Sequence, residues 1–160
     1  MQHAGVNHAA ATDWEAVYLA ESATLWRALL LQTGSREIAS DAVAEAFAQA
    51  IARGDEIRRP GAWVWKAAFT IARTESKRRR VDPPAAAPNE PVMSDTMVDL
   101  IRALATLSST QRAATLLHYF AGYSVAETAT ILGSSRSTVG VHLFRARNKL
   151  RDELGADYAH

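Results

Sequence analysis

Basic side chains are gathered in two short segments of this sequence, where they could bind a polyanion such as nucleic acid. Residues 58–80 hold eight Lys or Arg against the single acid Glu75, a net charge of +7. Residues 136–151 hold five bases and no acid, a net charge of +5. Phosphate groups attract such clusters, although a solvated helix face explains the charge alone equally well. Both segments are therefore candidate contacts with a polyanion.

Three residues just before and within the second basic segment have a spacing that is typical of a helix-turn-helix. Ala129 is small enough for two helices to touch, Gly133 tolerates the backbone of a tight turn, and Val139 can lock the second helix. The other side of that second helix combines small polar residues with arginine, which suits a reader of the major groove. The residues on this side are Arg136, Ser137, Thr138, Gly140, Val141, His142 and Arg145. An ordinary helical hairpin with a basic solvent face is the alternative.

Helical periodicity in the rest of the chain supplies the elements that must position these segments. In the N-terminal half, apolar stripes and capping residues predict helices from a Thr12–Glu15 capping box to Gly34, from Ser35 to Gly54, and from Pro60 into the first basic segment. In the C-terminal half they predict helices from Asp95 to Ala105, from Ser108 or Ser109 to Gly122, from a Ser124–Glu127 capping box to Gly133, and from Ser135 to about Leu154. No segment has the alternation of a strand, so we expect an all-α protein.

Prolines mark a boundary between two halves. Residues 81–94, VDPPAAAPNEPVMS, hold four of the five prolines and predict a semi-extended linker. We expect a disordered tail over residues 1–12, a small helical domain over 13–80, and a helix-turn-helix domain over 95–155. Each half is close to the lower size limit for independent folding, so stabilisation by a partner is plausible.

Composition argues against several classes of protein. The chain has no cysteine, and none of its five histidines is paired with acids at the spacing of metal ligands. It also lacks a glycine-rich phosphate loop and a nucleophile elbow, so we expect no enzyme, no metal and no cofactor. No apolar run is long enough to span a bilayer, and the first twelve residues do not form a secretory signal. We therefore expect a cytoplasmic protein without membrane insertion.

Both halves resemble parts of one known family. Residues 107–154, with the pattern LSSTQR…LLHYFAGYSVAETATILGSSRSTVGVHLFRARNKL, resemble region 4 of bacterial sigma factors. In the N-terminal half, SREIASDAVAEAFAQAIA resembles the polymerase-binding helix of region 2, and RPGAWVWKAAFTIA resembles its promoter −10 segment. Two such regions joined by a short linker are similar to the extracytoplasmic-function (ECF) group.

The resemblance implies a non-enzymatic subunit that binds core RNA polymerase and promoter DNA, with an anti-sigma protein as a further partner. It places core polymerase binding on Asp41, Val43, Glu45 and Phe47. It places −10 contacts on the 54–60 loop and on Trp63, Trp65, Lys66, Arg73 and Lys77. It places −35 contacts on Arg112, through a phosphate, and on Arg136, Ser137, Thr138, His142 and Arg145. Near-neutral total charge suits a subunit that reaches DNA already attached to polymerase.

Some positions depart from the patterns, and other functions stay open. Thr128 stands where helix-turn-helix motifs bury an aliphatic residue, and Gly140 lies inside a helix, which costs about 1 kcal/mol relative to alanine. Related sigma factors usually have Lys or Arg at the position of Gly140 and often Ser at that of Val141. Trp63 is expected in the core, and Trp65 either in the core or stacked on a base. The alternatives are a helix-turn-helix regulator that binds DNA without polymerase and an adaptor that has lost DNA binding.

Overall fold

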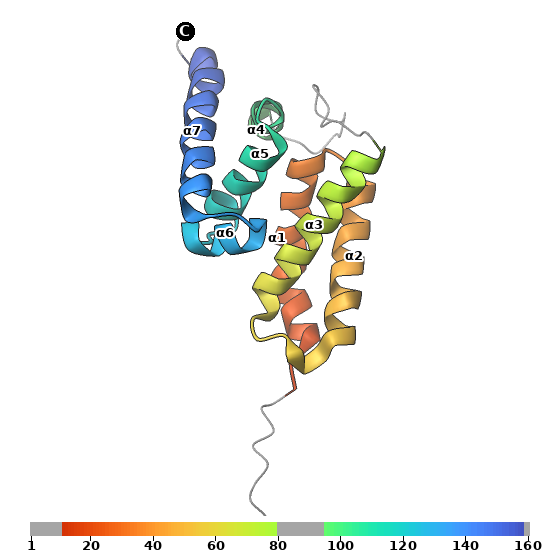
Figure 1. Ribbon diagram of the computed structural model, residues 1–160. Helices are drawn as coiled ribbons and strands as arrows, with labels where there is room; N and C mark the ends of the chain where they lie inside the picture. Colours follow the sequence, from red (N-terminus) through yellow and green to blue (C-terminus); the bar gives the residue numbers. More distant parts are fainter. Residues whose placement is uncertain (1–10, 80–94, 159–160) are drawn as a thin grey trace, which may run out of the picture.

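Helices form the whole of the fold in the part of the chain that the structure describes. The computed structural model describes residues 11–79 and 95–158, so most of the predicted tail and the whole proline-rich linker lie outside the described residues. The N-terminal half contains α1 (Trp14–Thr33), α2 (Arg36–Arg53), the short 3-10 helix η1 (Gly54–Glu56) and α3 (Pro60–Arg79). The C-terminal half contains α4 (Asp95–Ala105), α5 (Ser109–Thr115), the π-helical turn η2 (Leu116–Phe120), α6 (Val125–Leu132) and α7 (Arg136–Tyr158) (Figure 1). No strand occurs within these ranges, and the all-α prediction is confirmed.

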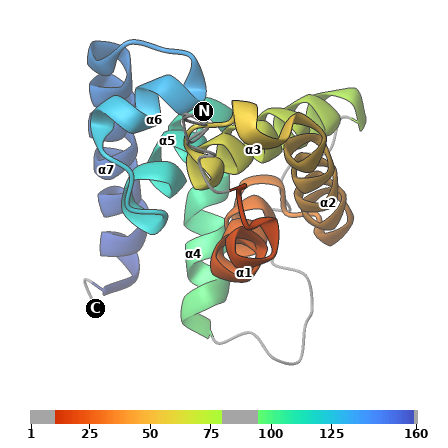
Figure 2. The same cartoon turned by 90° about the horizontal axis from the view of Figure 1, so that it is seen from below.

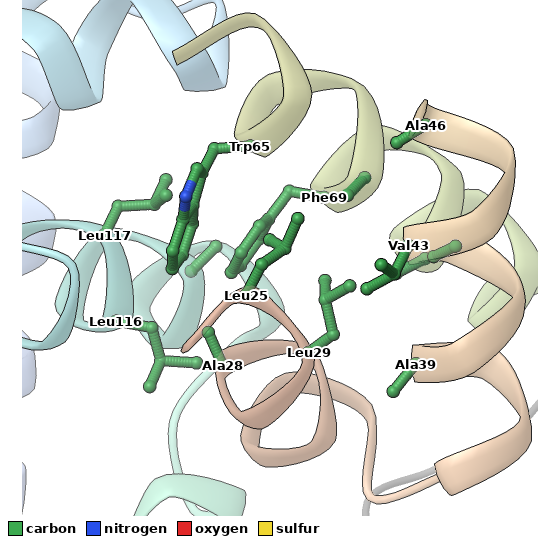
Figure 3. Close-up of a cluster of buried hydrophobic side chains, with 14 of the residues drawn as sticks. Leu25, Ala28, Leu29, Ala39, Val43, Ala46, Trp65, Phe69, Leu116 and Leu117 are labelled. Atoms are coloured by element: carbon green, nitrogen blue, oxygen red, sulfur yellow. The ribbon is translucent and has the colours of Figure 1, made fainter. Parts of the chain in front are cut away.

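Small residues on α2 let the three long helices of the N-terminal half pack closely. Every alanine at the buried face of α2 is fully buried: Ala39, Ala42, Ala46 and Ala50. Larger side chains from α1 and α3, including Leu25, Leu29 and Phe69, fill the space between the helices (Figure 3). Pro60 occupies the first position of α3, where its missing N–H would have no partner in any case.

Local capping explains most of the helix ends. The carboxylate of Asp13 accepts a hydrogen bond from the Ala16 N–H at 3.1 Å, so α1 begins one residue later than predicted. The predicted capping box of Thr12 and Glu15 is therefore wrong: with Asp13 as the N-cap, Glu15 falls at the second helical position rather than the third. The predicted capping box at Ser124 and Glu127 is present with both reciprocal bonds.

The helix predicted from residue 108 to Gly122 changes character halfway. Ser108 caps α5, but after Thr115 the backbone widens into the π turn η2, in which the Ala121 N–H donates to the Leu116 carbonyl at 2.9 Å. The Tyr123 N–H then donates to the Leu117 carbonyl at 3.0 Å. The π-helix is rare and occurs mostly as a single turn within an α-helix, as it does here. The turn brings Tyr123 back towards the N-terminal half.

The two halves share one hydrophobic core. Buried residues of α4, α5 and η2, such as Leu104 and Leu117, belong to the same cluster as Leu25 and Phe69. Figure 2 shows α4 and α5 beside α1, and α6 beside the start of α3, as the contacts between these helices require. We call this contact between α1, α3 and the C-terminal helices the junction. It covers part of α3, which was predicted to face DNA.

Candidate nucleic-acid interface

The predicted helix-turn-helix is formed by α6, the turn after it and the start of α7. Gly133 ends α6 with a positive φ of 64°, the left-handed conformation that glycine adopts without steric cost. Ser135 then starts α7, because its hydroxyl accepts a hydrogen bond from the Thr138 N–H at 3.1 Å. Ala129 and Val139 are buried together with Ala114 and Leu143 in one cluster. All three positions therefore meet the structural demands that the spacing implied.

One side of α7 is exposed along its first three turns. Four of the five residues predicted there for −35 contacts are exposed: Arg136, Ser137, Thr138 and Arg145. His142 is half-buried, and its Nδ1 is buried without a hydrogen-bond partner. Thr138 also accepts a hydrogen bond from the Ser135 hydroxyl at 2.8 Å, which ties it to the start of the helix. The arginine side chains are thus the main exposed donors of this face.

Two exposed apolar side chains on the same helix were not singled out from the sequence as DNA contacts. Val141 is 46% exposed and Phe144 is 58% exposed. The signal for Phe144 was present, because it lies one position off the apolar stripe of Leu143, Ala146 and Leu150. A side chain one residue away from such a stripe points about 100° away from it. We call Val141 and Phe144 the apolar pair of α7.

Arg112 is not on the surface, as a phosphate contact would require. The side chain is 5% exposed and donates three hydrogen bonds to main-chain carbonyls. Its Nε reaches Leu104 O at 2.9 Å, Nη2 reaches Leu107 O at 2.9 Å, and Nη1 reaches Gln32 O across the junction at 2.7 Å. Arginine suits this position because its planar group carries five donors in fixed directions. In this conformation Arg112 connects the two halves, and it could reach a phosphate only after they separate.

Two residues predicted to contact the −10 element also lie at the junction. Trp65 is 2% exposed, its ring stacks on Phe69 and meets Tyr123 edge to face, and its Nε1 donates to the Glu21 carboxylate at 2.7 Å. Arg73 donates from Nη2 to the Thr110 hydroxyl at 3.0 Å, and burial lowers its pKa. Trp65 was predicted to lie either in the core or stacked on a base, and in the structure it lies in the core. Base stacking by Trp65 would require the junction to open.

The remaining predicted −10 residues lie at the surface of α3. Lys66 and Lys77 are exposed, and Trp63 is half-buried with the Arg53 guanidinium 5.6 Å from its ring centroid. Beside Trp63 lies a cavity of about 500 Å³ between η1, the start of α3 and the end of α6. Its lining includes one acid, Glu56, and four basic residues: Arg53, Arg58, Arg59 and Lys66. A cavity with these walls favours an anionic occupant.

The basic end of α3 is partly neutralised by carboxylates. Arg78 and Arg79 both donate to Glu75, and these hydrogen bonds lower the pKa of Glu75 to about 2. Arg79 also pairs with Glu37 at the start of α2, at 3.1 Å. These pairs lie at the surface, with Glu75 partly exposed and Arg78, Arg79 and Glu37 exposed, so they contribute little to stability. Because the net charge of +7 already subtracts Glu75, it is Glu37, outside the segment, that reduces the positive field at this end further.

A groove runs between α1 and α2 on the face away from the C-terminal half. Its volume is about 750 Å³, and Val43 and Phe47 lie at its floor, with the Phe47 ring 5.0 Å edge to face from Tyr18. Of the residues predicted to bind polymerase, Val43 and Phe47 are buried, whereas Asp41 and Glu45 are exposed. Sequence reasoning missed the groove's rim, which includes Tyr18 at 49% and Ile51 at 58% exposure. Apolar side chains this exposed beside a groove favour the binding of an apolar partner.

Sequence comparison relates the chain to proteins of known function. Residues 97–150 match the family described as sigma-70, region 4. The chain is 31% identical over 169 aligned positions to "ECF RNA polymerase sigma factor SigL" of Mycobacterium tuberculosis, and the alignment covers 94% of this chain and 96% of that protein. Near-complete coverage of both chains means that the likeness includes the N-terminal half as well as the helix-turn-helix.

Structural comparison finds the same arrangement of helices in solved complexes. The sigma factor RpoE, solved in complex with the anti-sigma factor NepR from Bartonella quintana, has a TM-score of 0.74 and 24% identity, over 91% of this chain and 98% of that one. CnrH, solved in complex with the cytosolic domain of CnrY, has a TM-score of 0.68 and 21% identity, over 90% of this chain and 88% of that one. Likeness at these identities establishes a shared fold.

Proposed function

The chain belongs to the ECF family of RNA polymerase sigma factors, and from this premise we propose which of its faces bind polymerase and promoter DNA. A sigma factor directs transcription initiation by joining core polymerase to specific promoters. The proposal assigns the α1–α2 groove to polymerase, α7 to the −35 element, and the η1–α3 surface to the −10 element. Membership of this family argues against the alternative function, a regulator that binds DNA without polymerase.

The −35 assignment rests on one observation above all, the two-sided character of α7. One side buries Val139, Leu143 and Ala146, which hold the helix against α5 and α6. The opposite side exposes Arg136, Ser137 and Arg145 with no acidic residue from 136 to 151. A helix locked on one side and basic on the other can enter the major groove without rearranging the domain that carries it.

Core polymerase is assigned to the α1–α2 groove because the groove has an apolar floor and because α2 exposes two acids, Asp41 and Glu45, next in sequence to the lining residues Ser40 and Ala44. An amphipathic helix of the partner could place its apolar residues against Phe47 and Ile51. Asp41 and Glu45 lie one helical turn apart on α2 and are both exposed, so they can pair with basic residues beside that apolar stripe. This face lies away from the junction, so polymerase can reach it while the junction is intact.

The −10 assignment requires a change of conformation. Lys66 and Lys77 can contact DNA as they stand, but Trp65 and Arg73 are covered by Tyr123 and Thr110 of the C-terminal half. Full use of the α3 surface therefore requires the junction to open, with loss of the hydrogen bond between Arg112 and Gln32. We call the conformation described above the closed state. Binding of polymerase would supply the free energy for opening if it bound the open state more tightly.

An anti-sigma protein is a further proposed partner. Two proteins with this fold, RpoE and CnrH, were each solved with a protein partner, NepR and CnrY. A partner that binds both halves of the closed state would keep Trp65 and Arg73 covered and so prevent promoter recognition. Such a partner acts by population shift, because it stabilises one of two conformations.

Transcription from defined templates tests the function. Run-off transcription with core polymerase should yield specific transcripts only when the chain is added. Ile51→Glu should abolish both transcription and co-purification with core polymerase, because it places a charge at the apolar rim of the groove without disturbing the buried core. Arg145→Ala should weaken transcription from promoters that need a −35 element while core binding persists. Absence of any specific transcript with the wild-type chain would overturn the proposal.

The proposed role is non-enzymatic and cytoplasmic. It requires no catalytic group, because the chemistry of RNA synthesis belongs to the polymerase. In the ranges that the structure covers, no helix is long and apolar enough to cross a membrane. We place the protein in the cytoplasm because promoter DNA and polymerase are there.

A further inference from the structure

Two exposed apolar side chains lie in the middle of the DNA-facing side of α7, next to the half-buried His142, and arginine stands at both ends. Val141 and Phe144 are 46% and 58% exposed, and they lie three residues apart, so they share one face of the helix. Gly140 adds no side chain there, and a Cβ placed on it would meet nothing within 4 Å. Arg136 precedes this stretch and Arg145 follows it. Single exposed apolar residues are ordinary, but here two of them occupy the centre of a basic surface.

These side chains limit what the helix can recognise. Gly140, Val141 and Phe144 offer no hydrogen-bond donor or acceptor, so they cannot read the polar edges of guanine, cytosine or adenine. The only apolar group that a base presents in the major groove is the C5-methyl group of thymine. Flanking arginines favour nucleic acid over an apolar protein as the occupant of this surface, because they attract phosphate.

The spacing of the apolar pair fits two neighbouring base pairs. Positions three apart on a helix are separated by about 4.5 Å along its axis. Successive base pairs are stacked about 3.4 Å apart. Side chains of these sizes, rooted at those positions, can therefore each reach a different base pair.

We propose that Val141 and Phe144 select thymine at two neighbouring positions of the −35 element by contacting its methyl groups. The proposal rests on the assignment of α7 to the −35 element and deepens it, because it names the base that the centre of the helix prefers. Arg136 and Arg145 then supply phosphate or guanine contacts on either side of the thymine positions.

Replacement of thymine by deoxyuridine tests this directly, because it removes the methyl group and leaves the hydrogen-bonding edge intact. Run-off selection from templates with a randomised −35 element, using holoenzyme, first identifies the preferred sequence. Binding of holoenzyme is then measured on templates with deoxyuridine at single thymines. We expect two neighbouring positions at which the substitution weakens binding about fourfold each, the effect of losing one buried methyl group.

Substitution of the apolar pair identifies the side chains responsible. Val141→Ala and Phe144→Ala should each remove the sensitivity to deoxyuridine at one of the two positions. Arg145→Ala should weaken binding but keep that sensitivity. Tyr119→Ala is the matched control, since Tyr119 has a similar exposure of 53% but lies in η2, and it should change neither property.

Each outcome decides the proposal. A selected −35 element without neighbouring thymines on either strand, or full deoxyuridine sensitivity in both apolar-pair variants, overturns it. So does loss of core polymerase binding in Phe144→Ala, which would show that the surface binds protein. If wild-type holoenzyme initiates specifically but deoxyuridine has no effect on its binding, the methyl contact is overturned and the −35 assignment of α7 is not. No specific initiation at all overturns the −35 assignment together with it.

Discussion

Replacement of Arg112 by methionine separates two roles for this residue, a structural one at the junction and a contact with phosphate. Methionine has a similar length and fills the same space, but it cannot donate to the carbonyls of Leu104, Leu107 and Gln32. The substitution therefore removes three hydrogen bonds from a charged donor and leaves three carbonyls to find other partners.

The expected loss follows from the geometry of these bonds. Their lengths are 2.9, 2.9 and 2.7 Å, and a hydrogen bond from a charged donor contributes about 1.5–3 kcal/mol. Burial of the guanidinium costs several kcal/mol, which methionine avoids, so the terms partly cancel. We expect Arg112→Met to lower the free energy of unfolding by about 3 kcal/mol, a large fraction of the total for a small protein.

Urea unfolding followed by circular dichroism measures this change. Arg145→Met is the matched control, because it removes the same group from an exposed position and should shift stability by less than about 0.5 kcal/mol. A phosphate contact predicts the reverse pattern for Arg112→Met: unchanged stability, and a slope of affinity against salt that is smaller by about 1. Stability within about 1 kcal/mol of wild type would refute the reasoning from burial.

Four further substitutions test other features. Thr128→Val should stabilise the protein by about 1 kcal/mol in urea unfolding, because Thr128 is fully buried and its hydroxyl has no hydrogen-bond partner. Gly133→Ala should destabilise it by about 1 kcal/mol, since φ is positive there, whereas Gly140→Ala should stabilise it by about 0.5–1 kcal/mol, since Gly140 is helical with open space around it. An equal effect of the two alanines would contradict the backbone argument. Burial, helped by the nearby Glu21 carboxylate, raises the pKa of Tyr123 to about 12, so this tyrosine stabilises the fold below pH 10 and loses that contribution as the pH rises towards 12. Tyr123→Phe should lack this loss, and urea midpoints of both proteins at pH 9 and pH 11 will reveal the difference.

Helix limits that depend on neighbours in sequence could be predicted. Ser124, Glu127 and Gly133 act within one turn of their own position, and the structure has the capping box and the left-handed turn that their spacing implied. The limits of prediction appear where packing decides. The π turn over residues 116–120 was not predicted, and in it Leu116 and Leu117 are buried in the core that residues of α1 and α3 share (Figure 3).

In the candidate site, too, the exposure of some residues could be predicted from the sequence and that of others could not. The exposure of Arg136 and Arg145 followed from their place opposite a buried stripe. The burial of Arg112 did not, because its partner Gln32 lies 80 residues away in the sequence. Trp65 and Arg73 are covered for the same reason, by contacts with residues of the other half. Sequence patterns describe the faces of single helices, and they carry little information about which faces meet.

The chemistry of the Arg112 contacts has a consequence for how this junction tolerates sequence change over evolution. All three acceptors are main-chain carbonyls, and a carbonyl is present whichever side chain a position carries. Substitutions at 32, 104 or 107 therefore leave these acceptors in place as long as the backbone holds. A salt bridge can survive an exchange of its two charges, but no second substitution can restore this contact once the arginine is lost. Among side-chain substitutions, those at residue 112 are therefore the ones that remove these three bonds.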